Sequence, residues 1–268
     1  MKTTIEQIAN SKIGIQLARN EAWPSLKELA DEVISNAKEH GVALAKNLSL
    51  TREQFKELVN LAGKTAEHRF GTGSAELLDL NADPNPEKYV TGRVALPLHN
   101  DGAFVGTHPS YIILYCVEFN QSNGYGETEI CDQKLAFESM PEHLKAIFEK
   151  DWEYKIHDAS HFPSIAHKWI SVPPLIKKDD GTTSFNLALP FDTTEKAPAW
   201  SVRLADHDEQ NSRDLLVELD QFLKNCDAFY SHRWNVGDLL IINNSKVIHG
   251  RNTITENGTR HLFRGQLQ

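Results

Sequence analysis

The chain has 268 residues, of which 40% are hydrophobic and 24% are charged, a mixture typical of a globular protein. Its 28 Lys and Arg residues stand against 37 Asp and Glu residues, a net charge of −9. This balance argues against a general nucleic-acid binder or a binder of anionic membranes, because both need a cationic surface. The three cysteines form no CxxC pair, and no apolar run has the length of a signal peptide or a transmembrane helix. We therefore expect a cytoplasmic protein.

The first third of the chain predicts a mixture of helices and strands. Apolar residues at helical spacing predict a helix over residues 24–40, which Gly41 would end. The segment 41–47 predicts a short strand. Thr51 and Gln54 have the spacing of a capping box and predict the start of a second helix.

After residue 88 the pattern changes to short strands. β-branched, aromatic and apolar residues are concentrated in the segments 111–118, 127–132, 184–189, 228–234, 238–243 and 260–267. Helices are predicted over 133–150 and 212–225. So many short strands favour a sandwich or barrel with helices on one side, in one domain with an N-terminal α/β part (1–88) and a β core (89–268).

The first candidate site is the run His99-Asn100-Asp101. In a strand, His99 and Asp101 would point to the same side, where an imidazole and a carboxylate could bind one cation. The pattern alone is weak, because about one H-x-D or H-x-E is expected by chance in such a chain. His207-Asp208-Glu209 is such a match, within a polar stretch that predicts a loop and a helix start.

The second candidate lies near the C-terminus. His249-Gly250-Arg251 follows a buried strand, and Arg260 and Arg264 share one face of the last predicted strand. Arginines on a strand are often merely exposed, but a guanidinium also binds a carboxylate through two hydrogen bonds. Two histidines and one carboxylate form the facial triad of non-haem Fe(II) oxygenases, which leaves three open positions for an α-keto acid and O₂.

Together, these motifs resemble those of the TauD/TfdA (taurine dioxygenase-like) family of Fe(II)/2-oxoglutarate-dependent oxygenases, over roughly residues 20–268. The resemblance rests on His99-x-Asp101, Gly126-Glu127-Thr128, His249-Gly250-Arg251, Arg260 and Arg264, in this order. It implies a mainly β fold with flanking helices, the double-stranded β-helix or jelly roll. It also implies a role for six residues: His99, Asp101 and His249 as catalytic Fe(II) ligands, Thr128 and Arg260 on the distal carboxylate of 2-oxoglutarate, and Arg264 on the substrate. In some members of the family the arginine that matches Arg264 supports the co-substrate instead, so this alternative stays open.

The activity that the resemblance implies is oxidative decarboxylation of 2-oxoglutarate to succinate and CO₂, coupled by O₂ to hydroxylation of an unactivated C–H bond. We expect a small polar substrate, anionic or amino-acid-like, and no nucleic-acid or membrane partner. The presence of Asp101 disfavours halogenation. Desaturation or another oxidative rearrangement in specialised metabolism stays open, as does a homo-oligomer. A non-catalytic jelly-roll metal-binding or sensor protein is the alternative from another class, but it would not need Arg260 or Thr128.

Overall fold

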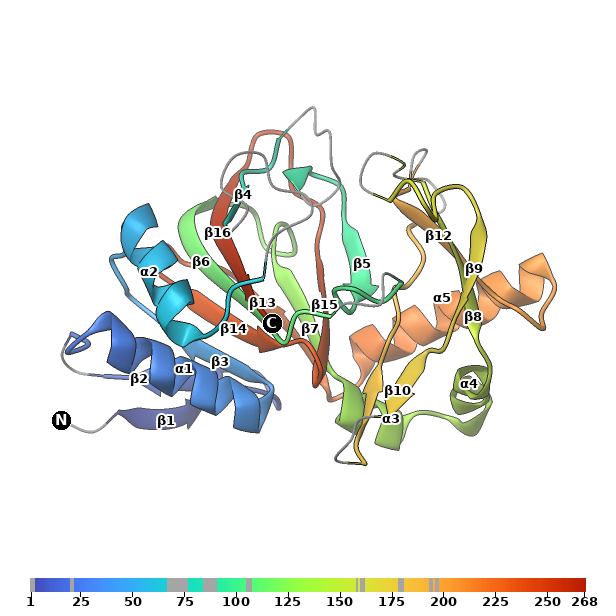
Figure 1. Cartoon of the computed structure of the whole chain (residues 1–268), viewed down its shortest axis with the longest axis horizontal. Helices are drawn as coiled ribbons and strands as arrows, with labels where there is room; N and C mark the ends of the chain where they lie inside the picture. Colours follow the sequence, from blue (N-terminus) through green and yellow to red (C-terminus); the bar gives the residue numbers. More distant parts are fainter. Residues whose placement is uncertain are drawn as a thin grey trace.

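The computed structural model describes residues 3–19, 22–66, 77–83, 91–104, 108–157, 159, 162–177, 181–192, 195 and 198–268. Its described strands form two main sheets of a jelly roll (Figure 1). The larger sheet has the order β1 (Thr4–Gln7), β2 (Ile15–Ala18), β3 (Val42–Ala45), β14 (Leu239–Asn243), β6 (Tyr111–Asn120), β16 (Thr259–Leu267) and β4 (Leu78–Leu80). The smaller sheet has the order β13 (Phe229–His232), β7 (Thr128–Asp132), β15 (Val247–Arg251) and β5 (Leu96–His99). The expectation of a mainly β jelly roll with flanking helices is confirmed.

Smaller elements stand beside these sheets. A three-stranded sheet has the order β12 (Trp200–Leu204), β8 (Trp152–Ile156) and β9 (Trp169–Val172), and β10 (Leu175–Lys177) pairs antiparallel with β11 (Thr183–Phe185). Helix α5 (Glu209–Asn225) lies next to the three-stranded sheet in Figure 1. No described helix is both long and apolar enough to cross a membrane.

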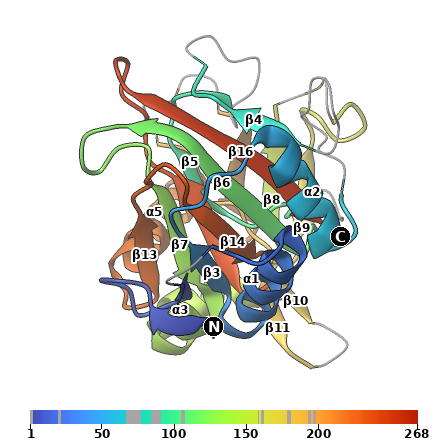
Figure 2. The same ribbon diagram turned by 90° about the vertical axis from the view of Figure 1, so that its left-hand side faces the viewer.

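The central strand β14 is buried on both faces, which explains its uninterrupted apolar sequence. Leu239 and Ile241 pack under helices α1 (Leu26–His40) and α2 (Arg52–Ala62), whereas Leu240 and Ile242 face the space between the two main sheets. Figure 2 shows the two helices against the outer face of the larger sheet. The predicted capping box is confirmed, because the Thr51 side chain and the Gln54 side chain each accept a hydrogen bond from the other's backbone N–H.

Two predicted helices differ from the observed ones at identifiable residues. The segment 133–150 is divided into α3 (Gln133–Ser139), α4 (Glu142–Ala146) and a short 3₁₀ turn (Ile147–Glu149). The division falls at Pro141, which has no backbone N–H for a continuous helix. Helix α5 begins earlier than predicted because the Asp208 carboxylate accepts a hydrogen bond from the backbone N–H of Asn211, at 2.8 Å. Asp208, the middle residue of the chance H-x-E match, is therefore a helix cap.

The strand predictions need two corrections. Only the first residues of the segment 184–189 belong to a strand, since β11 ends at Phe185. Strand β5 ends at His99, so Asp101 lies in the turn that follows and not on the strand itself. The turn, rather than strand alternation, therefore places the carboxylate beside the imidazole. The division of the chain at residue 88 stays a prediction.

Candidate metal centre

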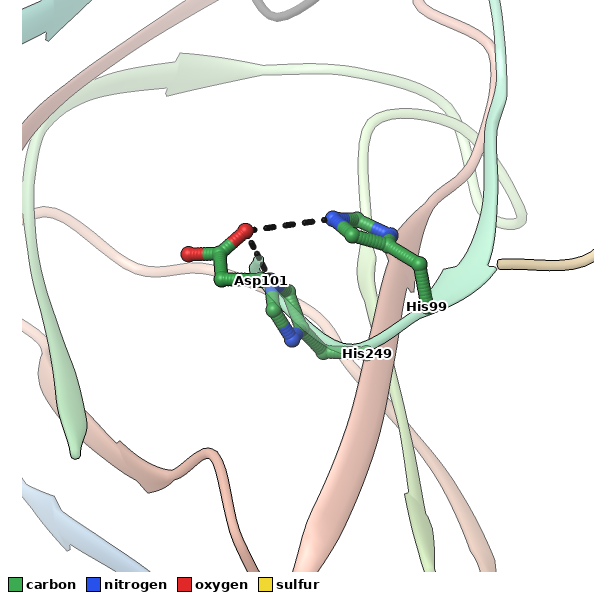
Figure 3. A group of neighbouring side chains, drawn as sticks. All are labelled: His99, Asp101 and His249. Carbon is green, nitrogen blue, oxygen red and sulfur yellow. Dashed lines mark ion pairs between the residues drawn. The ribbon is translucent and has the colours of Figure 1, made fainter. Parts of the chain in front are cut away.

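Neighbouring strands of the smaller sheet bring the predicted metal ligands together. His99 at the end of β5 lies directly opposite His249 in β15, with ring centroids 4.5 Å apart. Asp101 Oδ1 lies 3.4 Å from His99 Nε2 and 3.8 Å from His249 Nε2 (Figure 3). One ligand atom from each of the three side chains lies within 4.8 Å of the others, which is close enough to bind one ion.

Gly250 allows the two histidine strands to approach this closely. A Cβ atom at this position would lie 2.7 Å from the carbonyl oxygen of Leu96 and 3.2 Å from the backbone nitrogen of Leu98. Any larger residue would push β5 away from β15. The glycine in the His249-Gly250-Arg251 motif therefore helps to keep His99 opposite His249.

Two asparagines hold the turn that carries Asp101. Asn244 Oδ1 accepts a hydrogen bond from the Asp101 backbone N–H, and Asn244 Nδ2 donates to the Asp101 carbonyl, both at 3.0 Å. Asn100 Nδ2 donates to the Asn244 carbonyl at 2.9 Å, so Asn100 also supports this turn. These contacts involve the backbone of Asp101 and not its carboxylate. The sequence motifs did not single out Asn244. The available signal was the pair Asn243-Asn244, which follows the apolar residues of β14.

The hydrogen bonds and charges around the candidate ligands suit a cation. The ring Nδ1 of His99 lies 2.8 Å from the Pro97 carbonyl and can donate to it, which leaves the Nε2 lone pair directed at the site. Burial lowers the pKa of His249 to about 3, so its imidazole is neutral. Burial raises the pKa of Asp101, but the Arg264 guanidinium, which donates to Asp101 Oδ2, and the two histidines together outweigh burial and hold the pKa well below its usual range. Neutral imidazoles and an ionised carboxylate are the forms that bind metals.

A second cluster, the anion pocket formed by Thr128 and Arg260, lies between β7 and β16. The Arg260 Nε donates to the Gly126 carbonyl at 2.9 Å, and one terminal nitrogen donates to Thr128 Oγ1 at 3.2 Å. Arg260 is buried, and within the described residues it forms no ion pair with a carboxylate. Its pKa is lowered by burial and by the charge of Arg251, which is opposite Thr128 in the register of β15 and β7. A buried cation without an anion is costly, so this pocket fits a carboxylate group.

Sequence reasoning missed two residues at the anion pocket. Trp234 Nε1 donates to Thr128 Oγ1 at 3.0 Å, and Arg251 is buried close enough to Arg260 to affect its pKa. Arg251 was part of a quoted motif but received no role, because only the fold places it opposite Thr128. The position of Arg264 against Asp101 neither requires nor excludes substrate binding, so that role stays a prediction.

A jelly roll with two histidines and one carboxylate at one point, and a buried guanidinium in an adjacent pocket, defines a class of protein. The three metal ligands match the facial triad of the non-haem Fe(II) oxygenases. In the adjacent anion pocket, the buried Arg260 guanidinium is suited to bind the far carboxylate of a keto acid that chelates the metal.

Comparisons with known proteins identify the family. The model for the "Taurine catabolism dioxygenase TauD, TfdA family" matches residues 4–266, so the chain belongs to this family. The chain is 26% identical over 274 residues to 3-((Z)-2-isocyanoethenyl)-1H-indole synthase of Fischerella ambigua (strain UTEX 1903), covering 98% of each chain. It is 23% identical over 193 residues to tyrosine isonitrile desaturase of Erwinia amylovora (strain CFBP1430), covering 70% of this chain and 64% of the relative.

A solved structure supports the same fold. The structure of PvcB, an Fe, α-ketoglutarate-dependent oxygenase from an isonitrile synthetic pathway, matches with a TM-score of 0.72 at 19% identity, covering 99% of this chain and 92% of PvcB. Membership of the TauD/TfdA family, and not this structural likeness, makes the chain an Fe(II)/2-oxoglutarate-dependent dioxygenase, with Fe(II) as its metal and 2-oxoglutarate and O₂ as co-substrates.

Proposed function

We propose that His99, Asp101 and His249 hold Fe(II), and that the anion pocket holds the distal carboxylate of 2-oxoglutarate. The iron, when bound, supplies the activation of O₂ that the protein side chains cannot provide. The protein contributes a neutral imidazole at His249, an ionised Asp101 and the buried charge of Arg260. The same arrangement leaves the substrate to be recognised by other residues near His99.

The substrate carries an aromatic ring, and the single observation behind this proposal is an aromatic wall beside His99. The wall consists of Trp200, Phe104 and Phe191. The ring centroid of Trp200 lies 6.0 Å from that of His99, 5.7 Å from that of Phe104 and 4.6 Å from that of Phe191. A ring that packs against another ring gains about 0.5–1.5 kcal/mol beyond its burial. A substrate bound beside His99 would therefore gain most from an aryl group.

The same substrate carries a carboxylate. The buried Nε of Arg264 has no hydrogen-bond partner in the described part of the chain, while a terminal nitrogen of the same guanidinium contacts Asp101. A second anion could accept a hydrogen bond from this guanidinium. This supports the expectation of an anionic or amino-acid-like substrate and narrows it to an aryl carboxylate.

Among aryl carboxylates, we propose an isonitrile derived from an aromatic amino acid, with dehydrogenation as the outcome. The two relatives named above are an isocyanoethenyl-indole synthase and a tyrosine isonitrile desaturase, and the first matches this chain over nearly its full length. In such a reaction the substrate loses two hydrogens, 2-oxoglutarate becomes succinate and CO₂, and O₂ supplies one oxygen atom to succinate and one to water. Hydroxylation of the same substrate is the second candidate.

The test is a turnover assay with matched substrates. The anaerobic enzyme, loaded with Fe(II) and 2-oxoglutarate, is mixed with tyrosine isonitrile, tyrosine, or the isonitrile of cyclohexylalanine, and O₂ is then admitted. We expect succinate and an alkene product with tyrosine isonitrile, and much less with the other two. A product that has gained an oxygen would support hydroxylation instead. No succinate above a His249→Ala control with any aryl carboxylate, or an equal rate with the cyclohexyl compound, would overturn the proposal.

A pair of tryptophan variants tests the aromatic wall itself. Trp200→Leu should reduce the preference for the aryl over the cyclohexyl substrate. Trp169→Leu is the matched control, because Trp169 is 38% exposed on β9 and packs against Arg203, away from the wall. Equal effects of the two variants on the preference would show that the wall does not contact the substrate.

A further inference from the structure

We propose that Trp234 is a positioning residue that fixes the direction of the Thr128 hydroxyl and makes it a donor to the co-substrate carboxylate. This inference rests on the proposed role of the anion pocket formed by Thr128 and Arg260. Trp234 lies two residues after the end of β13. It is 2% exposed and packs between the two main sheets.

The hydrogen bonds of Thr128 determine where its proton can go. Its Oγ1 receives one hydrogen bond from Trp234 Nε1 at 3.0 Å and one from Arg260 at 3.2 Å. Indole and guanidinium groups are donors only, and a hydroxyl has two lone pairs and one proton. With both lone pairs in use, the hydroxyl can only donate, and the described residues provide no acceptor for it. Its proton is therefore available to a bound acceptor such as a carboxylate.

Arg260 alone would not fix this direction. With one donor, Thr128 would retain a free lone pair, and its hydroxyl could rotate to place either that lone pair or its proton toward the pocket. A lone pair facing a carboxylate oxygen is repulsive. The second donor, Trp234, removes this alternative before the co-substrate arrives, so that no reorientation accompanies binding.

The indole of Trp234 is itself held from two sides. The ring of His232 meets it edge to face, with centroids 4.6 Å apart. The chain then turns back immediately, because Asp238 accepts a hydrogen bond from the Asn235 backbone N–H at 2.9 Å. Gly237 has a φ of +87°, and a Cβ there would lie 2.4 Å from the Leu48 carbonyl oxygen. The turn thus presses against a neighbouring segment and fixes the indole N–H against Thr128.

The experiment compares two keto acids that chelate a metal in the same way. 2-Oxoglutarate has a distal carboxylate, whereas 2-oxobutyrate does not. Each is titrated by calorimetry into the Mn(II)-loaded protein without O₂, for the parent and for Trp234→Phe, Thr128→Val and the double variant. Trp234→Phe keeps an aromatic ring in the core and removes the N–H donor together with part of the ring volume, and the 2-oxobutyrate titration controls for the lost volume.

We expect Trp234→Phe to weaken 2-oxoglutarate binding about 5- to 10-fold, the effect of about one hydrogen bond, and to leave 2-oxobutyrate binding unchanged. In the Thr128→Val background the tryptophan substitution should cause no further loss for 2-oxoglutarate. Equal weakening of both keto acids would indicate a merely structural role and overturn the proposal. An unchanged 2-oxoglutarate affinity in Trp234→Phe would also overturn it.

The double variant separates this proposal from the one on which it rests. If Thr128→Val leaves 2-oxoglutarate binding unchanged, the proposed anion pocket is wrong. If Thr128→Val weakens binding and Trp234→Phe does not, only the role of Trp234 is wrong.

A measurement on the unmodified chain covers the case in which Trp234→Phe does not fold. In the Zn(II)-loaded protein, the Trp234 indole N–H resonance, assigned from its nuclear Overhauser contacts with Thr128, should shift with 2-oxoglutarate and stay in place with 2-oxobutyrate. An indole resonance that responds identically to the two keto acids would contradict the proposal.

Discussion

Replacement of Arg260 by methionine would remove the buried positive charge of the anion pocket and retain a side chain of similar length. The guanidinium donates to the Gly126 carbonyl at 2.9 Å and to Thr128 at 3.2 Å, and no carboxylate neutralises it in the described part of the chain. If 2-oxoglutarate supplies that carboxylate, the variant loses at least one charge-assisted hydrogen bond, which contributes about 1.5–3 kcal/mol. The Kd for 2-oxoglutarate should therefore rise roughly 10- to 150-fold.

The same substitution should leave the thermal stability of the protein without co-substrate unchanged, or raise it. Loss of two hydrogen bonds costs about 1 kcal/mol each, but removal of an uncompensated buried charge offsets this by up to several kcal/mol. We therefore expect Arg260→Met to unfold at the same temperature as the parent or at a higher one. A residue that merely supports the fold would instead lower both the co-substrate affinity and the melting temperature.

The assay combines calorimetric titration of the Mn(II)-loaded protein with 2-oxoglutarate and a thermal melt of the metal-free protein. Arg203→Met is the matched control, since Arg203 lies on a half-exposed face and forms an ion pair with Glu153. That control should leave the Kd unchanged. A Kd for Arg260→Met within twofold of the parent value would refute the assignment of the anion pocket.

Three further predictions concern other parts of the structure. Gly250→Ala should weaken Mn(II) binding at least roughly tenfold in a metal titration, because its Cβ would lie 2.7 Å from the Leu96 carbonyl; unchanged affinity would show that β5 can shift freely. The free energy of unfolding of the metal-free protein should fall as the pH is lowered from 6.5 toward 3. The reason is that folding lowers the His249 pKa from 6.5 to about 3, so that in this pH range the unfolded chain binds one more proton than the folded chain. Urea titrations of His249→Gln should lack this contribution to the pH dependence. Asp208→Ala should cost about 1 kcal/mol of stability through the lost helix cap, and His207→Ala almost nothing, with metal affinity unchanged in both; reduced metal affinity in His207→Ala would restore this motif as a site.

The elements that could be predicted are those whose sequence pattern is complete within the element. The apolar strands β6, β14 and β16, and the helices with clear caps, have such patterns, and their predicted bounds are close to the observed ones. Strands β1, β2, β8, β9 and β12 have four or five residues each and were not predicted. A strand that short is defined mainly by its partner, and the partner of β8, for example, is β12, which lies far along the chain.

The candidate site shows the same limit at the level of single residues. His99, Asp101 and His249 could be named from motif and order, and the structure brings all three together. Trp234 and Asn244 carry no such motif, because each acts through one hydrogen-bonded neighbour that only the tertiary fold supplies. Their roles depend on sheet register, which a single sequence does not specify.

The residues proposed to bind the metal and the co-substrate lie on other sheets than Trp200 of the aromatic wall, which is proposed to select the substrate. The smaller sheet and the turn after β5 supply the candidate metal ligands and Thr128, while β16 of the larger sheet supplies both Arg260 and Arg264 from across the interior. The aromatic wall comes from elsewhere, since Trp200 begins β12 of the three-stranded sheet. Because no candidate metal ligand lies on that sheet, its residues can alter the shape of the space beside His99 without moving the iron or the co-substrate. Discrimination between substrates is therefore expected to depend on the wall, and the capacity to decarboxylate 2-oxoglutarate on the two main sheets.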